Sequence, residues 1–168
     1  MNLDRTYIAF RNFARKTQKE ARSNLSRKKI SASGNLRKEL KFYAVENPNS
    51  VQLVYERPIY ADFQDLGVSG KEKKYKTRFT YRSKKPPAGV FEKWAKQKKI
   101  KPRNKETGRF ITFKSFGFAM SNHIYRKGIS PKGFFITAYK RNVKGLPEPI
   151  LDAFNLDVNK FLEETFLA

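Results

Sequence analysis

Apolar side chains recur at spacings of three and four along the first 25 residues, the period of one face of an α-helix. This stripe consists of Leu3, Tyr7, Phe10, Ala14, Thr17, Ala21 and Leu25. The positions outside the stripe include Arg11, Arg15, Lys19 and Arg22. Asp4 falls in the first turn, where the helix dipole favours an anion. The pattern predicts a long N-terminal helix that ends before the turn-forming residues 33–35.

Strict alternation replaces the helical period in the next segment. Apolar side chains occupy every second position in residues 40–45 and again in residues 51–56. Between them lies Asn47-Pro48-Asn49, a run of typical turn residues. We therefore predict two antiparallel strands joined as a hairpin.

Three shorter elements are predicted in the middle of the chain. A helix-like apolar repeat over residues 59–67 ends at Gly67, which suits a left-handed helix cap. Aromatic and basic side chains alternate over residues 75–82, which predicts a strand or an extended arm. Pro86-Pro87 precedes a predicted helix over residues 88–99. The expected apolar side of that helix carries Val90, Phe91, Trp94 and Ala95.

The last third of the chain predicts two further helices. One spans about residues 111–127 and is ended by Gly128. Residues 131–133 turn the chain, and residues 134–136 are expected to re-enter the core. The last helix is expected to begin after Pro147. Its apolar face is formed by Ile150, Leu151, Phe154, Val158, Phe161 and Leu162.

Together these elements predict an α+β fold, in which helices from both ends of the chain cover a small antiparallel sheet. The chain has 168 residues and contains neither an internal repeat nor a Gly/Ser-rich linker, so we expect one domain over residues 1–168. Basic loop insertions are expected at about residues 71–87 and 100–109. An aromatic content of 14% argues against a disordered chain despite its charge.

Positive charge is concentrated in the middle of the chain. Residues 71–105 hold fifteen Lys or Arg and two acids, in a chain of net charge +22. Confined like charge repels itself and is best tolerated beside an anion such as nucleic acid. The alternative without a binding role is a solvated loop that keeps the protein soluble. The candidate residues for contact with DNA or an acidic partner are Lys71, Lys73, Lys74, Lys76, Arg78, Arg82, Lys84, Lys85, Lys98, Lys99, Lys101, Arg103 and Lys105.

Two further expectations concern the basic loops. They contain little to bury, so we expect them to become well ordered only against a subunit or DNA. Tyr75, Phe79 and Tyr81 are interleaved with the basic residues and could stack on exposed bases. The favoured alternative is that these rings pack on one side of an extended segment while Lys and Arg point to water.

Few side chains in the sequence suit catalysis. The chain has no cysteine and one histidine, His123, which excludes thiolate chemistry and sites built from several imidazoles. Asp62 and Asp65 are the candidate ligands of a magnesium-dependent nuclease, but the same spacing occurs on any exposed helical turn. We therefore predict no enzymatic activity, no metal and no cofactor. No apolar run approaches the roughly 20 residues that span a bilayer, so no membrane association is expected.

Two elements of the sequence follow the predicted helix and hairpin in a characteristic order. The first has the pattern Tyr-x-x-Phe-x-(Asp/Glu)-x-Gly, and the second has the pattern Ile-x-x-Lys-Gly-Ile-x-Pro-x-x-Phe-Phe. Their positions here are Tyr60, Phe63, Asp65 and Gly67, then Ile124, Lys127, Gly128, Ile129, Pro131, Phe134 and Phe135. In this order they resemble the neck or tail-completion (head–tail connector) proteins of tailed bacteriophages, often described as minor tail components. The resemblance covers roughly residues 25–166.

The resemblance implies a structural virion protein without enzymatic activity. It implies a closed ring of roughly six or twelve copies at the head–tail junction, assembled in the host cytoplasm. The implied partners are the portal and tail proteins, with non-specific contact to packaged DNA. The basic insertion after Gly70 and the loop over residues 101–109 depart from the family pattern. The alternative function is that of a free basic nucleic-acid-binding protein, acting in DNA packaging or at the ribosome.

Overall fold

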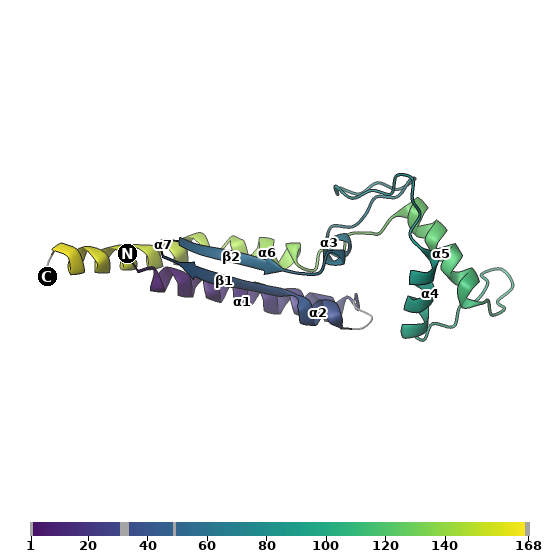
Figure 1. The fold of residues 1–168 in the computed structure, drawn as a ribbon, viewed down its shortest axis with the longest axis horizontal. Coiled ribbons are helices and arrows are strands. Elements are labelled where there is room, and N and C mark those ends of the chain that lie inside the picture. Colours follow the sequence, from purple (N-terminus) through teal and green to yellow (C-terminus); the bar gives the residue numbers. More distant parts are fainter. Residues whose placement is uncertain (1, 31–33, 49, 167–168) are drawn as a thin grey trace. The chain divides into compact units, whose positions relative to one another are not determined.

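A computed structural model describes residues 2–30, 34–48 and 50–166 (Figure 1). Ser33 and Asn49, which belong to the two predicted turns, lie outside the described part. The described elements are α1 (Asp4–Arg27), α2 (Asn35–Glu39), β1 (Lys41–Asn47), β2 (Ser50–Glu56), α3 (Tyr60–Asp65), α4 (Ala88–Gln97), α5 (Phe113–Lys127), α6 (Ile136–Val143) and α7 (Pro147–Phe166). Seven helices and one two-stranded antiparallel sheet confirm the α+β class. None of the described helices is both long and apolar enough to cross a membrane.

The chain divides into two compact units. The terminal unit comprises Met1–Lys28, Asn35–Pro58 and Phe134–Ala168, and the central unit comprises Lys29–Gly34 and Ile59–Gly133. The chain therefore leaves the terminal unit after the hairpin and returns to it at Phe134. The hydrophobic pattern did not reveal this division, and the single domain stays a prediction.

The long helix α1 is the centre of the terminal unit, where it contacts the hairpin, α6 and α7 (Figure 1). Every residue of its predicted apolar stripe is buried or half-buried, and Thr6, Phe13 and Asn24 widen the buried face. The strands pair in the predicted antiparallel hairpin, with Phe42 opposite Tyr55. The local periodicity thus predicted both elements correctly.

Aromatic rings from three parts of the chain form the core between the hairpin and the helices. Phe42 lies edge-on to Phe13, Tyr55 and Phe135, with centroid separations of 5.8, 6.1 and 5.5 Å. Phe135 stacks on Tyr55 at 3.8 Å, and Tyr139 completes the cluster. Edge-to-face and stacked pairs add to the area-based stabilisation of such rings. The expectation that residues 134–136 re-enter the core is confirmed.

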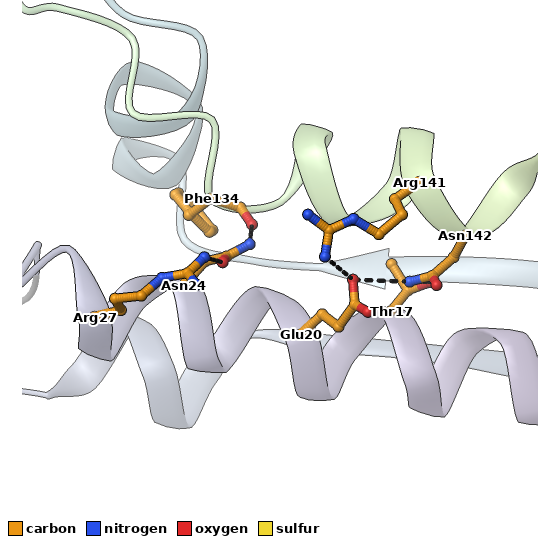
Figure 2. Close-up of polar contacts among 7 residues, drawn as sticks. All are labelled: Thr17, Glu20, Asn24, Arg27, Phe134, Arg141 and Asn142. Carbon is orange, nitrogen blue, oxygen red and sulfur yellow. Dashed lines mark hydrogen bonds and ion pairs between the residues drawn. The ribbon is translucent and has the colours of Figure 1, made fainter.

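The helix α6, which follows directly, was not predicted. It is eight residues long, with Ala138 and Asn142 buried and Ile136, Tyr139 and Val143 half-buried, so its apolar stripe is too short to show a helical period by itself. Tertiary contacts hold it instead. Asn142 Nδ2 donates to Thr17 Oγ1 at 3.3 Å and to Glu20 Oε2 at 3.2 Å, and Arg141 lies 3.9 Å from the same carboxylate (Figure 2).

The helix α7 holds the first turn of α1 through one buried carboxylate. Leu3, at the N-cap of α1, has no side-chain oxygen to satisfy the free backbone N–H groups of that turn. The carboxylate of Asp157 takes this role, accepting from the N–H of Thr6 at 2.9 Å, from its hydroxyl at 2.8 Å, and from the N–H of Arg5 at 3.3 Å. Burial raises the pKa of Asp157, but these hydrogen bonds outweigh it and the net pKa lies below the usual value.

Replacing Asp157 with alanine should therefore destabilise the terminal unit by about 1.5–3 kcal/mol, the cost of losing hydrogen bonds to a charged group. Urea unfolding followed by circular dichroism would measure this loss. Asp152→Ala is the matched control, because Asp152 is an exposed acid on the same helix. Because the pKa of Asp157 is lowered on folding, its contribution is present above its unfolded pKa and disappears as the pH falls through the folded pKa. The difference in stability between wild type and Asp157→Ala should shrink over that acidic range, and a difference that stays constant would contradict this role.

The predicted apolar face of α7 is largely uncovered. Ile150 and Val158 are half-buried, whereas the other four predicted positions are 39–59% exposed: Leu151, Phe154, Phe161 and Leu162. The helix touches α1 through the side that carries Asp157, and its last turns project beyond the N-terminal end of α1 (Figure 1). The predicted C-terminal helix is present, but most of its apolar face lies outside the contact with α1.

In the central unit α4 and α5 pack against each other. Gly117 permits their close approach, since a Cβ there would lie 2.6 Å from the carbonyl oxygen of Ala88. Trp94 stacks on Phe116 at 6.5 Å, and Ala95 is buried as expected. Val90 is 58% exposed, so its predicted place on the packed side is wrong.

Candidate interaction surfaces

The two sequence elements that carry the resemblance meet in the central unit. Val68 and Ile129 form an antiparallel bridge in which each N–H donates to the other's carbonyl at 2.8 Å. The N–H of Gly133 donates to the carbonyl of Asp65 at 2.9 Å. The helix α3 ends as predicted, with Gly67 at a φ of +77°. Segments about 60 residues apart in the sequence are thus joined backbone to backbone.

Glycines make this approach possible. Gly67 and Gly128 have positive φ, and a Cβ at either would lie under 3.0 Å from backbone atoms of the opposite segment. Gly70 has no positive φ, but a Cβ there would collide with the carbonyl of Arg126. Among the other positions of the two elements, Ile124 and Ile129 are half-buried and Phe134 and Phe135 are buried, whereas Tyr60, Lys127 and Pro131 are exposed. Asp65 is buried and Phe63 is half-buried.

The first basic loop leaves this junction and is tied to the end of α5. The N–H groups of Lys71 and Glu72 donate to the carbonyls of Tyr125 and Arg126 at 3.0 and 2.9 Å. Glu72 also pairs with Arg126 and with Lys127, the latter at 3.0 Å. The hydrogen bond from Arg126, and then that from Lys127, holds the pKa of Glu72 below its usual range. These contacts tie the first residues of the loop to the end of α5. The expectation that the loop becomes well ordered only against a partner stays a prediction.

Residues 75–82 do not form a regular strand, since residues 76–78 bend and the N–H of Thr77 donates to the carbonyl of Tyr75 at 2.9 Å. A single parallel bridge joins Thr80 to Ser69, whose N–H donates to the carbonyl of Phe79 at 2.8 Å. Phe79 lies edge-on to Phe63 at 4.8 Å, and Tyr81 lies 6.4 Å from the ring of Tyr125. These contacts favour the packing role of the interleaved aromatics over stacking on bases.

Cations gather around the ring of Tyr125. The ammonium groups of Lys71 and Lys85 lie 5.9 and 5.8 Å from its centroid, within the range of cation–π attraction. Lys85 also donates to Asn122 at 2.8 Å, and the Tyr125 hydroxyl donates to the carbonyl of Arg82 at 3.1 Å. This arrangement holds exposed cations in place and suits a polyanion. We call the group Lys71, Arg82, Lys85 and Tyr125 the Tyr125 surface.

The remaining basic candidates have varied environments. Arg78 lies 3.7 Å from Asp62 and 4.9 Å from the Phe79 ring, beside a hollow of about 370 Å³ lined by Phe63, Val68 and residues 78–82. Lys73 lies over Tyr75, and Lys74 donates to the carbonyl of Gly70. Lys76 and Lys84 are exposed.

The second basic group lies at the end of α4 and in the loop that follows. Lys98 is half-buried, whereas Lys99, Lys101 and Lys105 are exposed. Arg103 stacks over Phe110 at 4.1 Å and donates to the carbonyl of Gly108 at 3.3 Å. The loop is therefore closed on itself by Arg103.

The described residues contain no group of three or more His, Asp or Glu side chains that could hold a metal ion. Asp62, one of the two candidate nuclease ligands, lies beside Arg78 instead. His123 is an exposed side chain on α5. The geometry in this part of the chain provides no catalytic constellation around either residue.

A basic groove on the terminal unit was not recognised in the sequence. It is a hollow of about 590 Å³ lined by Arg15, Lys19, Arg22, Arg37, Ser23 and Ser26, together with Gln18. The signal was present, because Arg15, Lys19 and Arg22 recur at helical spacing outside the apolar stripe of α1. What the sequence could not show is that α2 brings Arg37 to the same place.

Comparisons with known proteins do not extend this picture. No protein family, curated protein or solved structure matches the chain.

Proposed function

We propose that this protein is a structural subunit of the head–tail connector of a tailed bacteriophage, which associates with copies of itself and with neighbouring virion proteins around the DNA channel. The proposal starts from the sequence resemblance. Its support from the structure is that the two resembling elements form one glycine-dependent junction rather than lying in unrelated places.

The observation that carries the proposal is the uncovered apolar face of α7. Leu151, Phe154, Phe161 and Leu162 are 39–59% exposed on one helix. Single exposed apolar residues are ordinary, but a contiguous row on one face marks a surface that a partner covers. An assembly subunit requires such a face.

Association with virions tests the proposal. Phage particles purified by density-gradient sedimentation should contain the chain at a constant ratio to the portal protein. Replacing Leu151 and Phe154 with serine should prevent incorporation without unfolding the chain, because neither side chain is buried. Val90→Ser is the matched control, since Val90 is equally exposed on the central unit. If the chain is absent from virions, the proposal is wrong.

A second candidate function, that of a free nucleic-acid-binding protein, is favoured by the Tyr125 surface. Lys71 and Lys85 are held over the Tyr125 ring, Lys85 also by a hydrogen bond to Asn122, and neither forms an ion pair with an acid among the described residues. Phosphates would gain the free energy of counterion release there. The two functions differ in particle association, and both allow contact with DNA.

If the first basic loop contacts DNA, its lysines should contribute to the salt dependence of the DNA-binding affinity. Replacing Lys71, Lys73, Lys74 and Lys76 with glutamine should leave the fold intact, because all four side chains are exposed. The slope of log K against log salt for duplex DNA should become shallower by about 0.9 for each of these lysines that contacts a phosphate. The matched arginine variant should keep the wild-type slope. Equal slopes for the glutamine variant and wild type, measured by fluorescence anisotropy, would show that the loop is only solvated.

A further inference from the structure

We infer that the projecting end of α7 in one copy docks in the basic groove on α1 and α2 of the next copy. This inference rests on the proposed function, because it names the contact through which connector subunits associate. Both surfaces belong to the terminal unit.

The groove is a positively charged site without an internal counterion. Arg15, Lys19 and Arg37 line it and have no acidic partner among the described residues. Arg22 is fixed in place, since its guanidinium donates to the carbonyl of Leu40 at 2.9 Å while its Nε is buried without a partner in the described part of the chain. The hydroxyls of Ser23 and Ser26 add hydrogen-bonding groups. Such a site suits a carboxylate-bearing segment.

The C-terminal segment that ends in α7 is acidic, in contrast to the rest of this basic chain. Residues 148–168 contain five acids and one lysine, whereas the chain as a whole has a net charge of +22. Glu163 and Glu164 are exposed in the last turns, which project beyond α1 (Figure 1), and the Glu164 carboxylate lies 3.7 Å from the ammonium group of Lys160. Phe161 and Leu162, directly before them, are 39% and 44% exposed. The charge of this end is complementary to that of the groove, and its apolar residues need cover.

The exposed side of α1 also offers an apolar contact. Ile8 is 44% exposed and precedes Arg15 by seven residues, so both lie on the same side of the helix. With Glu163 and Glu164 bound in the groove of the neighbouring copy, Phe161 and Leu162 would be free to contact Ile8 of that copy.

The two surfaces lie apart on the terminal unit. Asp157 fixes α7 at Thr6, whereas Lys19 of the groove lies thirteen residues further along α1, or roughly 20 Å at the helical rise. A copy cannot use the same patch on both sides of such a contact. Repeated in one direction the contact is head-to-tail and generates a ring if the rotation closes, whereas a reciprocal pair of the same contacts gives a two-fold dimer.

Charge reversal on each surface tests the contact. The groove variant is Arg15→Glu with Lys19→Glu, and the tail variant is Glu163→Lys with Glu164→Lys. All four residues are exposed, so the fold should persist, as circular dichroism can verify. In sedimentation velocity, the wild type should associate with rising concentration, and each variant alone should raise the dissociation constant by about tenfold or more. A chain carrying all four changes should associate again, because both charges are inverted.

A mixture of the groove and tail variants should also associate, since each retains one wild-type surface. The matched control is Lys105→Glu with Lys101→Glu, which inverts exposed charges in the second basic loop and should leave association unchanged. If all variants sediment like an associating wild type, the contact is wrong although the connector function stands. If the wild type stays monomeric yet is found in virions, the contact is again overturned and the function survives. If the groove variant weakens only the binding of duplex DNA, the groove is a nucleic-acid site and this inference fails.

Discussion

Replacing Phe134 with alanine should lower the free energy of unfolding of the terminal unit by about 3–5 kcal/mol. The side chain is 0% exposed, so the substitution removes buried apolar surface and leaves a cavity. The backbone contact of the residue persists, because its carbonyl accepts a hydrogen bond from Asn24 Nδ2 at 2.9 Å (Figure 2). The loss therefore reports on packing alone.

Urea unfolding of Phe134→Ala and Phe154→Ala would compare the stability lost by truncating a core side chain with that lost by truncating a surface side chain. Phe154 is 41% exposed in the same unit, and its truncation should change stability by less than about 1 kcal/mol when the chain is monomeric. Equal losses for the two variants would contradict the placement of Phe134 in the core. A loss of assembly with unchanged melting for Phe134→Ala would show instead that this residue contacts a neighbour.

Replacing Gly128 with alanine should be comparably destabilising for the central unit. Its φ is +76°, and a non-glycine residue in left-handed backbone costs about 1–3 kcal/mol. A Cβ there also collides with the carbonyl of Val68, and overpacking adds about 1–3 kcal/mol. We expect a total of about 2–6 kcal/mol.

Two other glycines separate these contributions. Gly108 has a φ of +68° with open space around it, so Gly108→Ala measures the backbone strain alone. Gly70 lacks a positive φ but faces the carbonyl of Arg126, so Gly70→Ala measures the collision alone. Thermal melting of the three variants should place Gly128→Ala lowest. If Gly108→Ala is as damaging as Gly128→Ala, the close approach of the two segments contributes nothing.

Some features of the candidate interaction surfaces could be predicted from the local sequence, whereas others depend on contacts between distant segments. The basic character of residues 71–87 followed from composition, and the structure adds the aromatic and acidic side chains that hold the loop. Glu72 was one of two acids in a basic window, and only the fold shows that it lies against Arg126 and Lys127. The basic groove needed α2 to contribute Arg37. Charge can be counted in a sequence, whereas its convergence depends on packing.

The sequence by itself determined the elements whose signal lies within a few residues of the chain. The helix α1 and the hairpin were predicted from their periods, and Gly67 and Gly128 were predicted as helix ends because a left-handed cap needs no distant partner. The tertiary structure alone decided whatever depends on groups far apart in the chain. Asp157 serves the first turn of α1 from 151 residues away, and α6 is held by Thr17 and Glu20 together with the packing of Tyr139. The apolar face of α7 stays largely uncovered because the helix meets α1 through the side that carries Asp157. Periodicity reveals that a face is apolar, but the lengths and positions of neighbouring elements decide whether that face is buried.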